Sequence, residues 1–216
     1  MKEILEKLLE SRNLGREEAY RVMSYIMEGR ATPAQIGAFL IALRLKGETV
    51  EEVSGFAEAM RDKALRLDYP GNLLDTCGTG GDGMGTINIS TLSALVVAGA
   101  GVKVAKHGNR SVSSLCGSAD LLEGLGVNIG MPPSYAERCL EECNFAFLFA
   151  PLYHPAMRYA AGPRKEIGIR TVFNILGPLT NPARVKRQLI GVFSPSLTSF
   201  IASVLRRLGT ERAMVV

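Results

Sequence analysis

The sequence lacks tryptophan, and it contains only two histidines and four cysteines among its 216 residues. It has no run of about 18 apolar residues, so it predicts no membrane-spanning helix. The cysteines are scattered and no secretory signal precedes them, which predicts reduced thiols in a cytoplasmic protein. One pair of cysteines four positions apart, Cys139 and Cys143, is too few for a typical zinc site.

A strong charge of one sign is also missing. The net charge is only +4, from 25 basic and 21 acidic side chains, and the 47% of hydrophobic residues fits a folded globular protein. The charge is uneven, because residues 1–100 carry 11 basic and 14 acidic side chains whereas residues 101–187 carry 11 and 6. This modest local excess favours a small anionic ligand over nucleic acid.

The first third of the chain predicts a small all-helical domain. Apolar residues keep helical spacing over residues 1–66, in four stretches separated by short turns. Two starts carry helix-capping residues: Thr32 precedes Pro33, and Thr49 with Glu52 forms a capping box. We assign residues 1–69 to this domain and expect no catalytic group in it.

Residues 70–216 predict a larger α/β domain with a mostly parallel central sheet, because short apolar runs alternate with helical stretches. Strands are predicted at residues 72–76, 102–105, 145–149, 187–192 and 213–216. Helices are predicted at residues 91–99, 119–125, 134–142 and 196–208. Five prolines between residues 150 and 182 predict rigid connections, and a hinge around residues 160–180 is expected to join the two domains.

The densest chemical signal runs from residue 75 to residue 91. A strand enters a loop with five glycines in eight residues, and a helix follows with its N-cap region at Ser90 and Thr91. Glycine amides and a helix N-terminus together favour a phosphate or pyrophosphate site, with a flexible surface loop as the alternative. The spacing of Gly78, Gly80 and Gly83 matches a dinucleotide fingerprint, but residues 102–107 are basic where a Rossmann site needs an acidic residue, so we reject NAD.

A second signal lies at residues 106–114, which we expect just beyond the next strand. Lys106 and Arg110 offer positive charge, and Asn109 and the serines offer hydrogen bonds. Because residues 70–100 contain no Lys or Arg, an anion bound by the glycine-rich loop must take its cation from this segment. A solvated basic loop is the alternative. Further along, His154 stands between Tyr153 and Pro155, and we favour a packed structural role for it.

Seven strings occur between residues 75 and 182: GTGGD, NIST, KHGNRSVSS, GSAD, YHPAM, PRKEIGIRT and NILGPLTNP. Their order and spacing resemble the anthranilate phosphoribosyltransferases of tryptophan biosynthesis. The resemblance implies a nucleoside phosphorylase/phosphoribosyltransferase-like fold, a homodimer formed through the helical domain, and Mg²⁺ as cofactor. It implies transfer of phosphoribosyl from 5-phosphoribosyl 1-pyrophosphate to the amine of anthranilate. A pyrimidine nucleoside phosphorylase-like enzyme and a non-catalytic nucleic-acid-binding relative are the alternatives.

The resemblance also implies a set of site residues. Those expected to bind phosphoribosyl pyrophosphate are Gly78, Gly81, Asp82, Thr86, Asn88, Ile89, Ser90, Thr91, Lys106, His107, Gly108, Asn109, Arg110, Ser111, Val112, Ser113, Ser114 and Ser118. Gly78, Asn109 and Arg164 are expected to hold anthranilate. Lys106, His107 and Arg164 would position the substrates and stabilise the transition state, and no residue is assigned as an acid–base catalyst.

Two departures from the family pattern concern the donor site. Leu115 and Cys116 stand where relatives often carry a lysine after the paired serines. Ser90 is the expected Mg²⁺ ligand, and the acidic pair that completes such a site is expected beyond Val216. The sequence therefore predicts an α/β domain that is incomplete at its C-terminus, with residues 213–216 as an edge strand.

Overall fold

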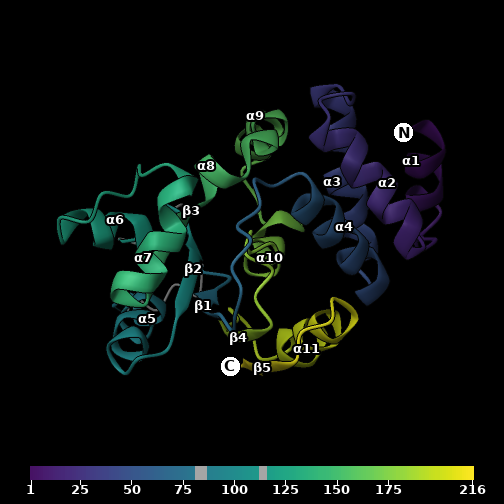
Figure 1. Ribbon diagram of the computed structural model, residues 1–216. Coiled ribbons are helices and arrows are strands. Elements are labelled where there is room, and N and C mark those ends of the chain that lie inside the picture. The colour runs from purple at the N-terminus through teal and green to yellow at the C-terminus, as the bar shows by residue number, and fades with distance from the viewer. Residues whose placement is uncertain (81–86, 112–115) are drawn as a thin grey trace. The chain divides into compact units, whose positions relative to one another are not determined.

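The computed structural model describes residues 1–80, 87–111 and 116–216 (Figure 1). It divides into two compact units. Residues 1–64 and 154–180 form a helical unit, and residues 65–153 and 181–216 form an α/β unit. No helix in the described ranges is long and apolar enough to cross a membrane.

Four N-terminal helices build the helical unit, as the apolar spacing predicts. They are α1 (Lys2–Leu9), α2 (Arg16–Met27), α3 (Pro33–Lys46) and α4 (Val50–Asp62). The capping box of α4 forms as expected, since Thr49 N donates to Glu52 Oε2 at 2.8 Å and Glu52 N donates to Thr49 Oγ1 at 3.3 Å. In the core, Phe39 and Phe56 meet edge to face with ring centroids 5.7 Å apart.

The segment 154–180 adds two helices that the sequence analysis did not predict. They are α9 (Arg158–Ile167) and α10 (Phe173–Leu176), accompanied by the short 3-10 helices η2 (Pro155–Met157) and η3 (Gly177–Leu179). Pro163 lies inside α9, where a proline costs about 3 kcal/mol. Because Ala160 and Pro163 are buried and α9 packs against α3, tertiary packing outweighs that cost.

The α/β unit contains a parallel five-stranded sheet with the order β3-β2-β1-β4-β5. Its strands are β1 (Leu74–Gly78), β2 (Val104–Gly108), β3 (Phe145–Phe149), β4 (Arg187–Gly191) and β5 (Arg212–Val215). All five predicted strands are present. However, β1 and β2 each start two residues later than predicted and extend further towards the glycine-rich and basic segments.

Helices cover both faces of this sheet, as expected for an α/β layer. They are α5 (Ile89–Gly99), α6 (Ser118–Gly124), α7 (Ala136–Cys143), α8 (Ala150–Tyr153) and α11 (Leu197–Arg207), with the 3-10 turn η1 (Pro133–Tyr135) before α7. Alternate residues of β3 show the two faces. Ala146 and Leu148 pack with Leu140 of α7, whereas Phe145 packs with Ala94 of α5.

Candidate functional site

The carboxyl ends of β1 and β4 mark the topological switch point of the sheet. These strands are neighbours, yet the chain continues from β1 towards β2 and β3 on one side and from β4 to β5 on the other. Gly78 pairs with Gly191, Thr79 N donates to Gly191 O at 2.9 Å, and Phe193 N donates to Thr79 Oγ1 at 3.0 Å. Ligands of open α/β sheets bind at such a point, so the glycine-rich segment begins where a ligand is expected.

The amino end of α5 is capped by Asn88. Its Oδ1 accepts Thr91 N at 3.0 Å and Ser90 Oγ at 3.2 Å, so the expected cap region at Ser90 and Thr91 was placed two residues too late. Thr76 Oγ1 donates to Ser90 O at 2.7 Å and ties the first turn of α5 to β1. The positive end of the helix dipole is thereby fixed beside the carboxyl end of β1, which favours an anion.

Lys106 occupies a different place from the one predicted. Together with His107 and Gly108 it belongs to β2, not to the segment after the strand, and its side chain is wholly buried. Its Nζ donates to Thr76 O at 2.6 Å and to Ser90 Oγ at 3.3 Å. Burial lowers the pKa of Lys106, against the opposing effect of Asp75. The ammonium group therefore lies at the first turn of α5 and adds its charge to the helix dipole.

A buried polar cluster supports this arrangement, and two of its members, Asp75 and Asn181, were not among the residues selected from the sequence. Asp75 accepts His107 N at 3.2 Å and Asn181 Nδ2 at 2.9 Å. Asn181 Nδ2 also donates to Ala105 O at 2.8 Å. Burial raises the pKa of Asp75, partly offset by Lys106. The cluster joins β1, β2 and the segment at residue 181, and a charged residue within an otherwise apolar strand is the sequence signal that could have revealed it.

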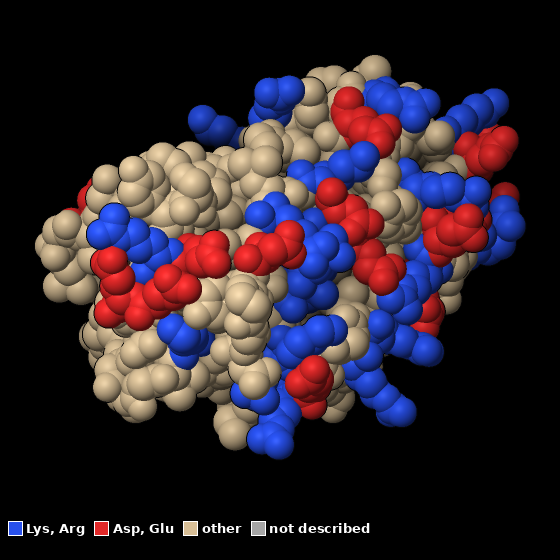
Figure 2. All heavy atoms as spheres, viewed as in Figure 1, with Lys and Arg blue, Asp and Glu red and all other residues tan. Residues whose placement is uncertain are grey.

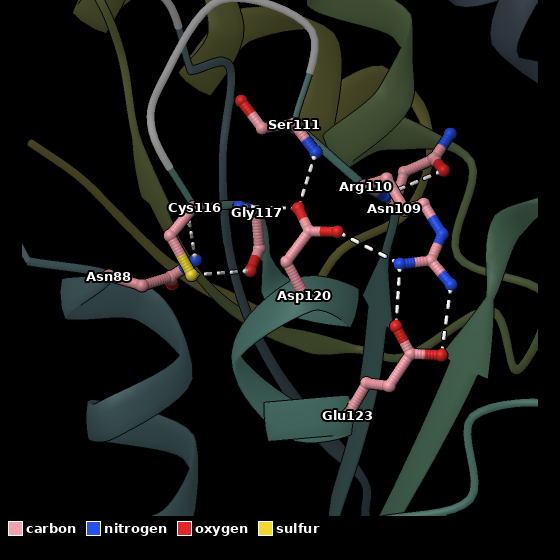
Figure 3. Close-up of polar contacts among 8 residues, drawn as sticks. All are labelled: Asn88, Asn109, Arg110, Ser111, Cys116, Gly117, Asp120 and Glu123. Carbon is pink, nitrogen blue, oxygen red and sulfur yellow. Dashed lines mark hydrogen bonds and ion pairs between the residues drawn. The ribbon is translucent and has the colours of Figure 1, made fainter. Parts of the chain in front are cut away.

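Arg110 is paired with two acidic side chains of α6 (Figure 3). Its Nη1 donates to Asp120 Oδ1 at 3.0 Å and to Glu123 Oε2 at 2.8 Å, and Nη2 donates to Glu123 Oε1 at 3.0 Å. These hydrogen bonds raise the pKa of Arg110. From the sequence, Arg110 was expected to offer positive charge to the anion site, and its pairing with α6 was not predicted.

Many of the other predicted donor-site residues of the α/β unit lie around the same edge of the sheet. They come from the ends of β1 and β2, the segment after β2 and the first turns of α5 and α6: Gly78, Asn88, Ile89, Ser90, Thr91, Lys106, His107, Gly108, Asn109, Ser111 and Ser118. Six further predicted residues lie outside the described ranges: Gly81, Asp82, Thr86, Val112, Ser113 and Ser114. The departure at Leu115 falls outside them as well.

Arg164, the expected anthranilate ligand, belongs to α9 of the helical unit. Its guanidinium carbon lies 4.8 Å from the centroid of the Phe173 ring, and burial lowers its pKa. Gly78 and Asn109 belong to the α/β unit, so the predicted anthranilate set draws on both units and stays a prediction.

His154 is buried in the helical unit, with 6% of its surface exposed. Burial lowers its pKa from 6.5 to about 4, although a hydrogen bond with the Thr180 backbone opposes the shift. A neutral, packed imidazole agrees with the structural role favoured from the sequence.

The described residues do not by themselves form a Mg²⁺ site. No cluster of three His, Cys, Asp or Glu side chains within those ranges could hold a metal ion. Ser90 Oγ is the one ligand predicted from sequence, and it lies 3.3 Å from the Lys106 ammonium. Hard divalent cations take six or more oxygen ligands, so further oxygens must come from elsewhere.

Figure 2 shows the charged side chains on one face of the molecule. Basic and acidic side chains are interspersed there, not gathered into one broad basic patch. A binding surface for a nucleic-acid backbone usually concentrates Lys and Arg.

Comparison with known proteins agrees with this architecture. The family model "Glycosyl transferase family, a/b domain" matches residues 70–216, and "Glycosyl transferase family, helical bundle domain" matches residues 2–64. An anthranilate phosphoribosyltransferase of Moorella thermoacetica is 60% identical over 218 residues, covering 100% of this chain and 64% of the relative. One from Bacillus caldotenax is 55% identical over 216 residues, covering 100% of this chain and 89% of the relative.

A solved structure gives the same result. The anthranilate phosphoribosyltransferase of Saccharomyces cerevisiae in complex with PRPP and Mg superposes with a TM-score of 0.91 at 30% identity, covering 99% of this chain and 64% of that one. The chain belongs to the anthranilate phosphoribosyltransferase family. Membership confirms the resemblance and the expected combination of a helical bundle with an α/β domain. The chain spans less than two thirds of the length of the Moorella and yeast anthranilate phosphoribosyltransferases.

Proposed function

We propose that this chain carries the donor site of an enzyme that transfers phosphoribosyl from 5-phosphoribosyl 1-pyrophosphate to the amine of anthranilate. The products are N-(5-phosphoribosyl)anthranilate and pyrophosphate, and the reaction belongs to tryptophan biosynthesis. The observation that carries the proposal is the Lys106 ammonium at the first turn of α5, beside the switch point of a parallel sheet. The division into domains at residues 69 and 70 also stays a proposal, whereas the compact units of the structure divide at residues 64 and 65 and include residues 154–180 in the helical unit.

The reaction is a substitution at C1 of the ribose. The anthranilate nitrogen forms a bond to C1, the bond from C1 to the pyrophosphate oxygen breaks, and the nitrogen then loses a proton to water. Backbone amides at the amino end of α5 and the Lys106 ammonium stabilise the negative charge of the leaving pyrophosphate. Since an aromatic amine is already nucleophilic, the step needs no strong general base.

Magnesium enters this proposal together with the donor. The yeast relative was solved in complex with PRPP and Mg. Because the described residues offer few oxygen ligands, we propose that phosphate oxygens of the donor complete the coordination of Mg²⁺ near Ser90. Bound there, the ion would neutralise part of the phosphate charge.

A homodimer formed through the helical unit is the proposed assembly, in the cytoplasm. The outward side of α3 supports it. Ala34, Ala38 and Leu45 are exposed and share one side of the helix with Ile41, and Leu45 is 81% exposed. Uncharged, apolar helix surface of this kind is common in subunit interfaces. Light scattering at several protein concentrations measures the assembly directly.

Product analysis tests the proposed reaction. The chain is incubated with phosphoribosyl pyrophosphate, anthranilate and Mg²⁺, and the products are separated and weighed by mass spectrometry. The expected adduct joins anthranilate to ribose 5-phosphate and appears with one equivalent of pyrophosphate. Phosphorolysis of a pyrimidine nucleoside without that adduct would favour a phosphorylase instead. Calorimetric titration with the donor measures binding even where turnover is slow.

Arg164→Ala tests the anthranilate ligand. A guanidinium pairs with an aromatic carboxylate through charge-assisted hydrogen bonds worth about 1.5–3 kcal/mol. We therefore expect the KM for anthranilate to rise about tenfold or more while the KM for the donor stays within about twofold. The matched control is Lys165→Ala, the exposed neighbour on α9. Equal increases in both KM values would contradict the assignment.

A further inference from the structure

We propose that Asp120 is a positioning residue of the donor site, which holds the backbone of residues 109–111 against the amino end of α6. Asp120 is not among the residues that the family resemblance assigns to either substrate. The inference rests on the proposed function, because Asn109 and Ser111 are the residues whose place it would set for phosphoribosyl pyrophosphate.

The carboxylate of Asp120 joins two stretches of backbone (Figure 3). Its Oδ2 accepts Ser111 N at 3.0 Å and Gly117 N at 2.9 Å, so one oxygen receives amides from both sides of residues 112–115. Ala119 N donates to Asn109 O at 3.2 Å and adds a backbone contact between the same stretches. The Asp120 side chain and this backbone contact therefore join the end of β2 to the start of α6.

The lack of a side chain at Gly117 permits the close approach of the two backbone stretches. A Cβ at this position would lie 2.3 Å from Ser111 N and 2.7 Å from Arg110 C, so any side chain would push the two backbones apart. The φ of Gly117 is −80°, which any residue can adopt. Glycine is therefore required here for close packing and not for its backbone conformation.

A neighbouring guanidinium compensates the negative charge of Asp120. A carboxylate beside a pyrophosphate site would repel the ligand, but Arg110 Nη1 donates to Asp120 Oδ1 at 3.0 Å. Glu123 binds the same guanidinium through both of its oxygens. The amides of Ser111 and Gly117 lower the pKa of Asp120 and keep it ionised. Arg110 thus neutralises the residue that positions the backbone.

One hydrogen bond connects the start of α6 to the amino end of α5. Asn88, the N-cap of α5, donates from Nδ2 to Cys116 O at 3.3 Å. The residue next to Gly117 is thereby linked to the helix end at which Lys106 lies. The backbone at Gly117 therefore couples the positions of three stretches, which are residues 88–91, 109–111 and 116–120.

Two measurements on the 216-residue chain test the inference. Amide hydrogen exchange followed by NMR reports whether Asp120 holds the two stretches, without any ligand. In Asp120→Ala we expect Ser111 N and Gly117 N to lose protection about tenfold, the value of one charge-assisted hydrogen bond. Calorimetric titration with phosphoribosyl pyrophosphate and Mg²⁺ should show a Kd about tenfold higher, with little change for anthranilate.

The matched control is Glu123→Ala, which removes a carboxylate from the same helix but leaves both bonds to Asp120 Oδ2. In this variant, the amide exchange rates of Ser111 and Gly117 and the Kd for the donor should stay within about twofold of their values in the unaltered protein. Gly117→Ala separates the backbones without changing charge, so it should weaken donor binding as Asp120→Ala does. Circular dichroism melts show that each variant is folded before it is compared.

The outcomes separate this inference from the proposed function. Unchanged amide exchange at Ser111 and Gly117 in Asp120→Ala would overturn the positioning role, whatever the Kd for the donor is. If Ser111 N and Gly117 N lose protection in Asp120→Ala but the Kd for the donor does not change, only the link to the donor site would be overturned. Failure of the unaltered chain to bind the donor would overturn the proposed function, and with it the purpose assigned to Asp120.

Discussion

Lys106 and Arg110 are four residues apart in one motif, yet the structure uses them in opposite ways. Lys106 is wholly buried in β2, and its ammonium group meets a backbone carbonyl and a serine hydroxyl. Arg110 lies near the surface, and its guanidinium meets the carboxylates of Asp120 and Glu123. The buried cation has no direct carboxylate contact among its described hydrogen bonds, whereas the exposed one has two.

This difference separates a buried cation without a carboxylate hydrogen bond from an exposed cation that two carboxylates bind. The Lys106 ammonium donates to neutral oxygens and interacts with the Asp75 carboxylate only through space, so it can still attract an incoming anion, and the low dielectric of its surroundings strengthens that attraction. A guanidinium held by two carboxylates brings no net positive charge. We therefore expect Lys106 to carry the electrostatic part of donor binding and Arg110 to contribute through structure.

The largest expected effect belongs to Lys106→Met. Methionine has a similar length but no charge, so the amino end of α5 loses the ammonium while the strand stays filled. We expect the Kd for phosphoribosyl pyrophosphate to rise about a hundredfold, the equivalent of losing about 2.7 kcal/mol of charge-assisted binding. Calorimetric titration in the presence of Mg²⁺ measures it.

The control for this variant is Lys103→Met. Lys103 precedes the amino end of β2 and donates to Leu140 O at 2.6 Å, away from the carboxyl ends of the strands. Its replacement should leave the donor Kd within about twofold. Because Lys106→Met leaves Thr76 O without its donor and the buried Asp75 without a nearby positive charge, a circular dichroism melt first shows that the variant is folded. A folded Lys106→Met protein that still binds the donor normally would contradict the comparison.

The sequence predicted the parallel sheet and the two clusters of site residues, because strand and helix periods, glycines and caps are local signals. The second strand was predicted to end at residue 105, whereas β2 continues through Lys106 and His107 to Gly108. A lysine within a buried strand needs oxygen partners, and Thr76 O and Ser90 Oγ accept hydrogen bonds from Lys106. The pairing of Arg110 depends in the same way on α6, which follows beyond residues 112–115.

Packing between distant segments explains the remaining differences. Proline rules favour connections over residues 150–182, yet α9 forms around Pro163 because its buried side packs on α3. Asp75 and Asn181 are 106 residues apart, and no local pattern relates them. These contacts follow from the fold, so they become visible only after the sheet is assembled.

His154 extends the comparison to a buried titratable group of the helical unit. Its folded pKa is lowered to about 4 from the usual 6.5, so the unfolded chain gains a proton below pH 6.5 while the folded protein does not. Stability should therefore fall as the pH drops from about 6.5 to about 4, by about 2 kcal/mol between pH 7 and pH 5. Urea unfolding of the protein and of His154→Gln over this range measures the difference, and parallel pH profiles for the two would contradict a buried neutral imidazole.

We expect the smallest effect from Arg110→Gln. This variant tests whether the exposed cation binds the donor directly. If Arg110 bound the donor phosphates directly, its loss would weaken donor binding as strongly as the loss of Lys106. Since its charge is already compensated by Asp120 and Glu123, we expect the Kd for phosphoribosyl pyrophosphate to change by only about threefold or less, within the range of an exposed ion pair. The double variant Arg110→Gln with Glu123→Gln removes one positive and one negative charge together, so its donor Kd should lie closer to that of the unaltered protein than Arg110→Gln does. A tenfold or larger loss in both variants would show that the guanidinium itself contacts the donor.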